Sequence, residues 1–141
     1  EALKTDEINS GLFSSDTWND YSKQISGILL DFKAWLTQSQ RTGSRVFGYG
    51  AAAKASTILN SFEIPSGSIL GIADASPEKQ SRFLPDTGIQ IITPEQLVAA
   101  SPTDIVIFPW NIKSEISKSL RDLLGESVNL WCLVPNIERV Q

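Results

Sequence analysis

The chain has 141 residues, of which 41% are hydrophobic and 20% are charged, and its formal net charge is -4. This composition is typical of one soluble domain with a single hydrophobic core. The acidic balance argues against a nucleic acid or an anionic membrane as a partner, because both would repel the chain. No apolar run approaches the roughly 20 residues of a membrane span, and no secretion leader is recognisable, so we expect a cytoplasmic protein.

Two residue types are missing from the chain, and a third occurs once. The sequence has no histidine, which removes Ser-His-Asp and Cys-His catalysis and imidazole metal sites from its chemistry. It has no methionine and begins at Glu1, so we expect a domain cut from a longer protein. Cys132 lies in the apolar run "LWCLV", which predicts a buried thiol and not a nucleophile.

The first 41 residues divide into two parts. Residues 1–14 are polar and weakly patterned, and we expect them to connect this domain, residues 15–141, to a preceding one. From Ser15 or Asp16, both good N-cap types, apolar residues recur at helical spacing. These are Trp18, Tyr21, Ile25, Ile28, Leu29, Phe32 and Leu36. The spacing predicts a long amphipathic helix that ends near "RTG".

The remainder alternates between strand-like and helical segments. The predicted strands are residues 45–49, 69–74, 90–92, 104–108 and 128–134. The predicted helices are residues 51–62, 94–100 and 112–124. This alternation predicts a Rossmann-like, doubly wound α/β fold: a mostly parallel five-stranded sheet with flanking helices, preceded by the long helix. We expect the common strand order 3-2-1-4-5.

A glycine turn follows the first predicted strand. The sequence "GYGAAAK" contains Gly48, Tyr49, Gly50, Ala51, Ala52, Ala53 and Lys54. It matches G-x-G-x-x-A between a strand and a helix, and Asp74 ends the next strand about 20 residues later. We expect the amides of Gly50, Ala51 and Ala52 to point outward and bind a phosphate. In the alternative interpretation, the glycines only make a tight turn and Asp74 caps a loop.

Two further segments are predicted to lie near this turn. The fourth strand ends in "FPWN", where Trp110 can stack on a base or sugar and Asn111 can hydrogen-bond to it. Alternatively, Trp110 belongs to the core and Asn111 caps the following helix. The long loop "DASPEKQSRFLPDTG" contains Pro77 at a short helix start, and Lys79 and Arg82 are either diphosphate-binding cations or solvated charges.

Several spaced motifs resemble one family. "GYGAAAKAST.LN", "D.SPEKQSRFLPDTGI.I.TPEQL", "PWN" and "LVPN", over roughly residues 18–138, closely resemble the C-terminal domain of SAM-dependent sugar C-methyltransferases. The resemblance implies a three-part enzyme of deoxysugar biosynthesis: a zinc-binding domain, a SAM-binding domain, and a Rossmann-like C-terminal domain that helps to hold a nucleotide-linked sugar. The chain departs from the family pattern at Ala55, Ser81 and Asp86, where glycine is usual, and at Gly88, where histidine is common.

The resemblance assigns site residues one by one. The family pattern falls on Gly48, Tyr49, Gly50, Ala51, Ala53, Lys54, Asp74, Pro77, Lys79, Arg82, Pro85, Trp110 and Asn111. It implies that these residues face a nucleotide diphosphate sugar, with a dTDP-sugar as the expected ligand. SAM and zinc would belong to domains outside this chain, and the SAM-binding domain of the same polypeptide would be a partner. The chain itself is expected to hold no cofactor, metal or catalytic residue.

Other functions remain compatible with the same residues. In an NAD-binding Rossmann domain of an oxidoreductase, the glycine turn would bind the pyrophosphate and Asp74 the ribose. A SAM-binding domain fits less well, because no acidic residue precedes the glycine turn on its strand. An assembly domain would use the fold only to dock its neighbours.

Overall fold

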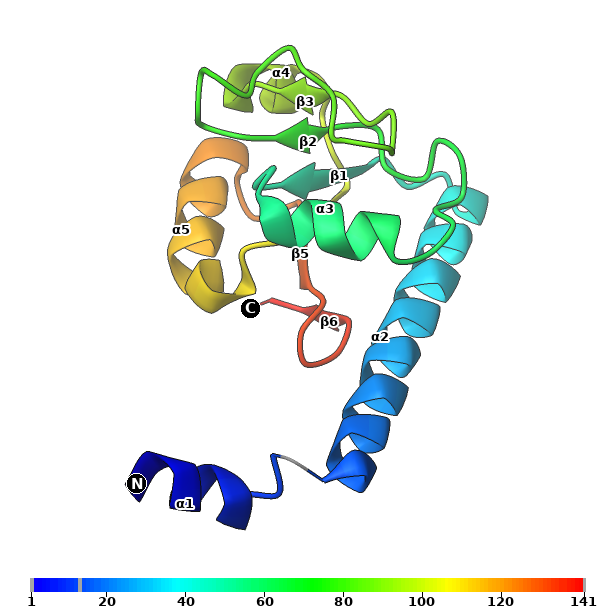
Figure 1. Ribbon diagram of the computed structural model, residues 1–141. Coiled ribbons are helices and arrows are strands. Elements are labelled where there is room, and N and C mark those ends of the chain that lie inside the picture. Colours follow the sequence, from blue (N-terminus) through cyan, green and yellow to red (C-terminus); the bar gives the residue numbers. More distant parts are fainter. Residues whose placement is uncertain (1, 13, 141) are drawn as a thin grey trace.

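The structure, a computed structural model, describes residues 2–12 and 14–140. It begins with helix α1 (Ala2–Asn9), where the sequence predicted only a connector. This helix was missed because it has no apolar face, and Leu3 and Ile8 are both exposed. Helix α1 lies at the far end of the next helix, away from the sheet (Figure 1).

Helix α2 (Ser15–Arg41) is the predicted long amphipathic helix. Its N-cap is Ser14, one residue earlier than expected, and the Ser14 hydroxyl accepts a hydrogen bond from the amide of Asp16. Phe32 and Leu36 are fully buried, whereas Trp18, at the other end of the same apolar side, is exposed. Only the second half of α2 therefore packs against the domain.

The sheet has the predicted order and one additional strand. Its strands are β1 (Val46–Tyr49), β2 (Ile72–Ala73), β3 (Ile91–Ile92), β4 (Asp104–Ile107), β5 (Asn129–Cys132) and β6 (Glu138–Arg139). The order is β3-β2-β1-β4-β5-β6, in which the first five are parallel and β6 is antiparallel to β5. β6 was not predicted because it consists of two exposed, charged residues. β2 and β3 are shorter than predicted.

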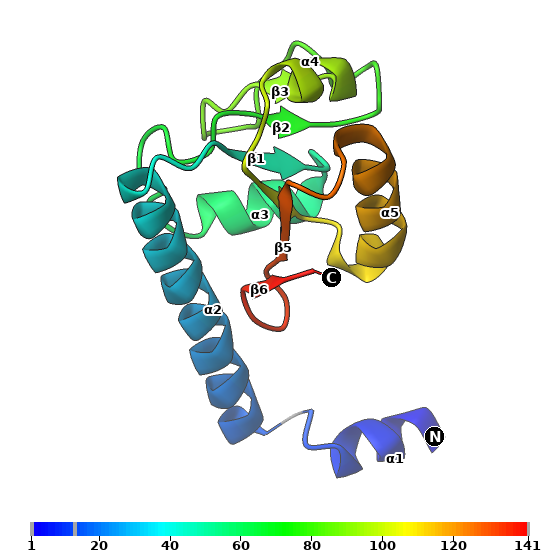
Figure 2. The same ribbon diagram turned by 180° about the vertical axis from the view of Figure 1, so that it is seen from behind.

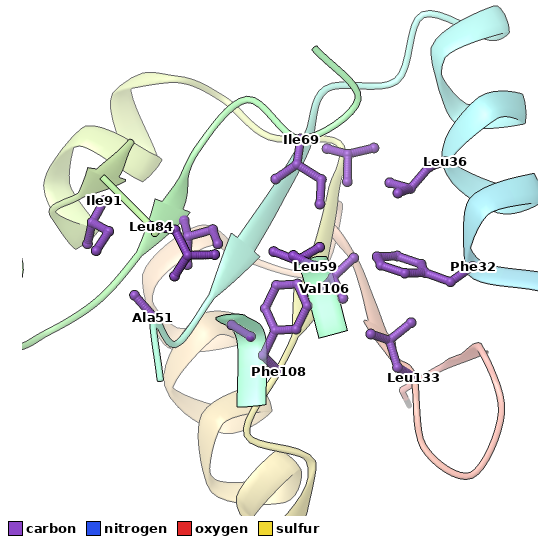
Figure 3. Packing of buried hydrophobic residues seen from close by; sticks show 13 residues of the cluster. Phe32, Leu36, Ala51, Leu59, Ile69, Leu84, Ile91, Val106, Phe108 and Leu133 are labelled. Carbon is purple, nitrogen blue, oxygen red and sulfur yellow. The ribbon is translucent and has the colours of Figure 1, made fainter. Parts of the chain in front are cut away.

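Helices cover both faces of the sheet. They are α3 (Ala53–Asn60), α4 (Pro94–Ala99), the 3-10 turn η1 (Trp110–Ile112) and α5 (Lys113–Leu124). On one face, Phe32 and Leu36 of α2 and Leu59 of α3 pack in a buried cluster (Figure 3). On the other face, residues of α4 and α5 pack against Phe47 and its neighbours. Figures 1 and 2 show α2 and α5 on opposite sides of the sheet.

This topology positions the glycine turn. Strands β1 and β4 are neighbours at the centre of the sheet, with Tyr49 paired with Ile107. The segments that leave these two strands, the glycine turn and the chain from Phe108 to Trp110, therefore lie side by side at the carboxyl edge. No helix of the described residues is both long enough and apolar enough to cross a membrane.

Candidate ligand site at the carboxyl edge of the sheet

Gly48 is a packing residue within β1. A Cβ atom at this position would lie 2.8 Å from Cε2 of Phe108 and 2.9 Å from Cγ1 of Ile72. Both neighbours are completely buried, so neither can easily move. Packing in the core is therefore sufficient to explain the first glycine of the motif.

Gly50 makes the turn itself. Its φ is +88°, and a Cβ atom would lie 2.5 Å and 2.6 Å from Cγ and Cδ of Pro109. A left-handed conformation without a side chain is available only to glycine at little cost. Gly50 thus allows the end of β1 and the segment after β4 to meet closely.

Two of the three amides that were expected to bind a phosphate are hydrogen-bonded within the chain. The Gly50 amide donates to the carbonyl of Ala73 (2.8 Å), and the Ala52 amide donates to the carbonyl of Gly50 (2.9 Å). Ala51 is buried in the core. The expectation that the amides of Gly50 and Ala52 point outward was therefore wrong, because the turn and β2 use them.

The first turn of α3 also has backbone amides at its N-terminal end. Ala52 is the N-cap, and its side chain makes no capping hydrogen bond. The Ser56 amide donates to the carbonyl of Ala52 (3.2 Å) and begins the helical hydrogen bonds. The preceding amides of the helix, those of Ala53, Lys54 and Ala55, are at positions that have no intrahelical acceptor. Ala53 is exposed at this end of the helix.

Lys54, Trp110 and Asn111 come together beside these amides. The Lys54 Nζ donates a hydrogen bond to Oδ1 of Asn111 and lies 4.3 Å from the centroid of the Trp110 ring. Both partners are uncharged. Among residues 2–12 and 14–140, no ion pair of Lys54 is found. The positive charge is thus held in place without being neutralised.

The alternatives for Trp110 and Asn111 can now be compared with the structure. Trp110 is half-buried, as expected for a residue at the sheet edge. It also lines an apolar pocket of about 290 Å³ between α2 and the domain. The N-cap of α5 is Ile112, which makes no side-chain capping bond, so Asn111 does not cap this helix. The contact of its side chain with Lys54, 57 residues away, had no sequence signal.

Asp74 is engaged within its own loop. The residue is 7% exposed, and its carboxylate accepts hydrogen bonds from the Ser76 amide (2.9 Å) and from Nζ of Lys79 (3.0 Å). Its backbone carbonyl accepts a further bond from Nε2 of Gln80 (2.9 Å). Asp74 therefore caps the loop, as the alternative interpretation held, and its charge is paired with that of Lys79.

The pKa values of Tyr49, at the end of β1, and of Glu78, in the loop after Asp74, are shifted. Burial raises the pKa of the Tyr49 hydroxyl above 10.0, and the negative charge of Asp74 adds to this effect. The Ser76 hydroxyl donates to the Glu78 carboxylate (2.6 Å) and lowers the pKa of that exposed group. Tyr49 is thus uncharged at neutral pH.

The remaining predicted residues lie farther along the loop. Pro77 and Arg82 are exposed, and the Arg82 carbonyl accepts a hydrogen bond from the amide of Ile91 (2.7 Å) in the edge strand β3. Because β2 separates β3 from β1, the backbone of Arg82 pairs with the edge strand and not with the strand that leads into the glycine turn.

Two departures from the resembled family have a visible consequence. Ser81 and Asp86 have φ values of 63° and 60°, which glycine adopts more readily. The loop keeps the left-handed conformation at both positions although neither is glycine.

Among the described residues, no group of three or more His, Cys, Asp or Glu side chains is arranged to hold a metal ion.

Comparisons with known proteins give the family. The family described as C-methyltransferase C-terminal domain matches residues 1–135. The C-methyltransferase NovU of Streptomyces niveus is 24% identical over 122 residues, which are 86% of this chain and 29% of NovU. The chain therefore spans less than a third of the length of that relative.

A solved structure has a similar fold. The UDP-D-quinovosamine 4-dehydrogenase of Vibrio fischeri matches with a TM-score of 0.50 and 16% identity, covering 70% of this chain and 93% of that one. This likeness supports the Rossmann-like arrangement. On the match over residues 1–135, the chain belongs to the C-methyltransferase C-terminal domain family.

Proposed function

We propose that this domain binds a nucleotide-linked sugar, of which a dTDP-sugar is the expected example, and positions it for methyl transfer. In this proposal the diphosphate lies at the first turn of α3, beside Lys54. A SAM-binding domain elsewhere in a longer polypeptide carries the methyl donor and the base. The acceptor is a ring carbon next to a keto group, because such a carbon can lose a proton to form an enolate.

The position of Lys54 is the observation that carries the proposal. A lysine in the first turn of a helix is unfavourable, because its charge meets the positive end of the helix dipole. α3 has no acidic residue in this turn to offset the lysine. A bound diphosphate would interact favourably with Lys54, with the dipole and with the free amides at once.

Trp110 and Asn111 hold the lysine ready for the ligand. The Lys54 Nζ lies over one side of the Trp110 ring, and Oδ1 of Asn111 accepts a hydrogen bond from it. A base that stacks on that side of Trp110 would have to displace the lysine. We therefore assign Trp110 the role of a wall that orients Lys54. The domain supplies position, and the chemistry takes place on groups outside this chain.

The NAD-binding alternative is less well supported by the geometry. In that class the acidic residue after the second strand binds the ribose hydroxyl groups. Here both carboxylate oxygens of Asp74 already accept hydrogen bonds, one from a paired lysine. A ribose would have to compete with these bonds for a residue that is 7% exposed.

Thermal unfolding with different ligands tests the proposal. A ligand that binds only the folded state raises the free energy of unfolding by about 2.7 kcal/mol at a hundredfold excess over Kd. The midpoint temperature of unfolding rises as a result. We expect a rise with dTDP or a dTDP-sugar and none with NADH or SAM. A rise with NADH and none with dTDP would favour an oxidoreductase domain instead.

A further inference from the structure

The first half of α2 presents an apolar surface that no described part of the chain covers. Trp18, Tyr21 and Ile25, here called the α2 surface, recur three and four residues apart and so lie on one side of the helix. Their exposed fractions are 58%, 52% and 57%. Farther along the same side, Phe32 and Leu36 are completely buried. The apolar side of α2 that faces the core at Phe32 and Leu36 therefore extends past the edge of the domain, where it is exposed.

The α2 surface leads directly into the apolar pocket beside Trp110. The pocket has a volume of about 290 Å³, and the described residues that line it are all apolar apart from the indole N–H of Trp110. Its lining residues are Ile25, Ile28, Leu29, Phe32, Ile58, Trp110, Leu133 and Val134. Ile25 belongs to both features. Since apolar cavities of about 150 Å³ accept a benzene ring, this pocket is large enough for an aromatic side chain.

We propose that the α2 surface and this pocket together dock the domain that precedes the present one in a longer polypeptide, with an apolar side chain of that domain in the pocket. The inference rests on the proposed function, in which this domain works beside others. Two observations select the occupant. The chain matches a family of C-terminal domains and covers 29% of NovU, so in that relative most of the length lies outside the matched region.

The second observation is the position of the N-terminal end of the described chain. α1 lies at the exposed end of α2, beyond the sheet (Figures 1 and 2). A domain joined to α1 would therefore emerge within reach of the α2 surface. Its contact area would be apolar at the centre, as in stable interfaces.

Trp110 links this docking surface to the ligand site. Its ring lines the pocket and also carries the Lys54 Nζ at 4.3 Å from its centroid. A side chain that enters the pocket would press on the same ring that orients the lysine. The docked domain would thus border the diphosphate site and fix its cation.

Hydroxyl-radical footprinting, which measures the exposure of single side chains, tests the docking without any ligand. We compare the 141-residue protein with the full-length polypeptide that contains it and read the oxidation of Trp18 and Tyr21 by mass spectrometry. We expect several-fold less oxidation of both in the full-length polypeptide. Leu30, 67% exposed and on another side of α2, is the internal control and should be oxidised equally in both. Equal oxidation of Trp18 and Tyr21 in the two proteins would overturn the proposal.

Two matched variants locate the contact. Ile25→Asp in the full-length polypeptide should restore the oxidation of Trp18 and Tyr21, whereas Leu30→Asp should leave their protection intact. Because both residues are exposed in the isolated domain, both variants should keep its circular dichroism spectrum. If Ile25→Asp fails to fold, Trp18→Asp replaces it, with Tyr21 as the reporter. Protection that survives these changes contradicts the assignment.

A second copy of the chain is the competing occupant. In that case the oxidation of Trp18 in the 141-residue protein would fall as its concentration rises, and sedimentation would show a dimer. This result would overturn the proposal, and a monomer with constant oxidation is the result that we expect. Since no nucleotide is present in any arm, failure of dTDP to bind would reject the proposed function and leave the docking result unaffected.

Discussion

The Lys54 Nζ lies 4.3 Å from the centroid of the Trp110 ring, and this contact joins the first turn of α3 to the segment that follows β4. The two residues are 56 positions apart and meet because β1 and β4 are neighbours in the sheet. The pairing of β1 with β4 also brings Pro109 against Gly50. Three features of the candidate site, the turn, the cation and the aromatic wall, therefore depend on one pair of strands.

Gly50→Ala tests whether this junction requires glycine. Alanine would have to adopt a φ near +88° and would place its Cβ within 2.6 Å of the Pro109 ring. We expect a loss of about 2 to 4 kcal/mol in the free energy of unfolding, measured in urea. Gly43→Ala is the control, because its φ is +73° and no atom lies within 4 Å of the added Cβ. It should cost only about 1 to 2 kcal/mol. Equal losses would show that the contact with Pro109 does not matter.

The pKa of Tyr49 gives a second prediction. Because burial and Asp74 raise this pKa in the folded state, its contribution to stability is present below pH 10 and is lost as the pH rises through the higher folded value. In Tyr49→Phe, the free energy of unfolding should decline less steeply above pH 10. Asp74→Asn should lower the Tyr49 pKa, as followed by phenolate absorbance. A Tyr49 titration that is insensitive to Asp74→Asn would show that the charge of Asp74 does not act on the Tyr49 hydroxyl.

Lys79→Gln distinguishes a loop residue from a ligand residue. Lys79 pairs with the nearly buried Asp74 at 3.0 Å. Because the lysine is partly exposed and water weakens the pair, we expect its loss to lower the free energy of unfolding by only about 1 kcal/mol. The affinity for dTDP should not change, because Lys79 is committed to Asp74. A large loss of dTDP affinity with an unchanged fold would place Lys79 at the diphosphate.

The sequence predicted most of the fold because its strong patterns coincide with burial. The apolar runs at residues 45–49 and 104–108 became the central strands, and the helix predicted over residues 94–100 became α4, which begins at a capping box of Thr93 and Gln96. α1 and β6 were missed, because exposed segments carry no hydrophobic period.

The candidate site was predicted less well than the fold. The motif "GYGAAA" located the turn. The spacing of its residues does not reveal which amides are hydrogen-bonded within the chain, such as that of Gly50. It also does not reveal that Lys79 pairs with Asp74 or that Lys54 reaches Asn111. These contacts depend on side-chain directions that only the folded chain sets. The roles of these residues in ligand binding stay predictions.

Titration calorimetry of dTDP with Lys54→Gln and Lys118→Gln tests the central claim most directly. Lys118 is an exposed lysine on α5, so its variant makes the same change of charge away from the site. Loss of a charge-assisted contact should weaken dTDP binding by about tenfold in Lys54→Gln, or about 1.4 kcal/mol. Lys118→Gln should bind as the unmodified protein does. If dTDP binds to the unmodified protein and Lys54→Gln binds it equally tightly, the diphosphate does not lie at the first turn of α3.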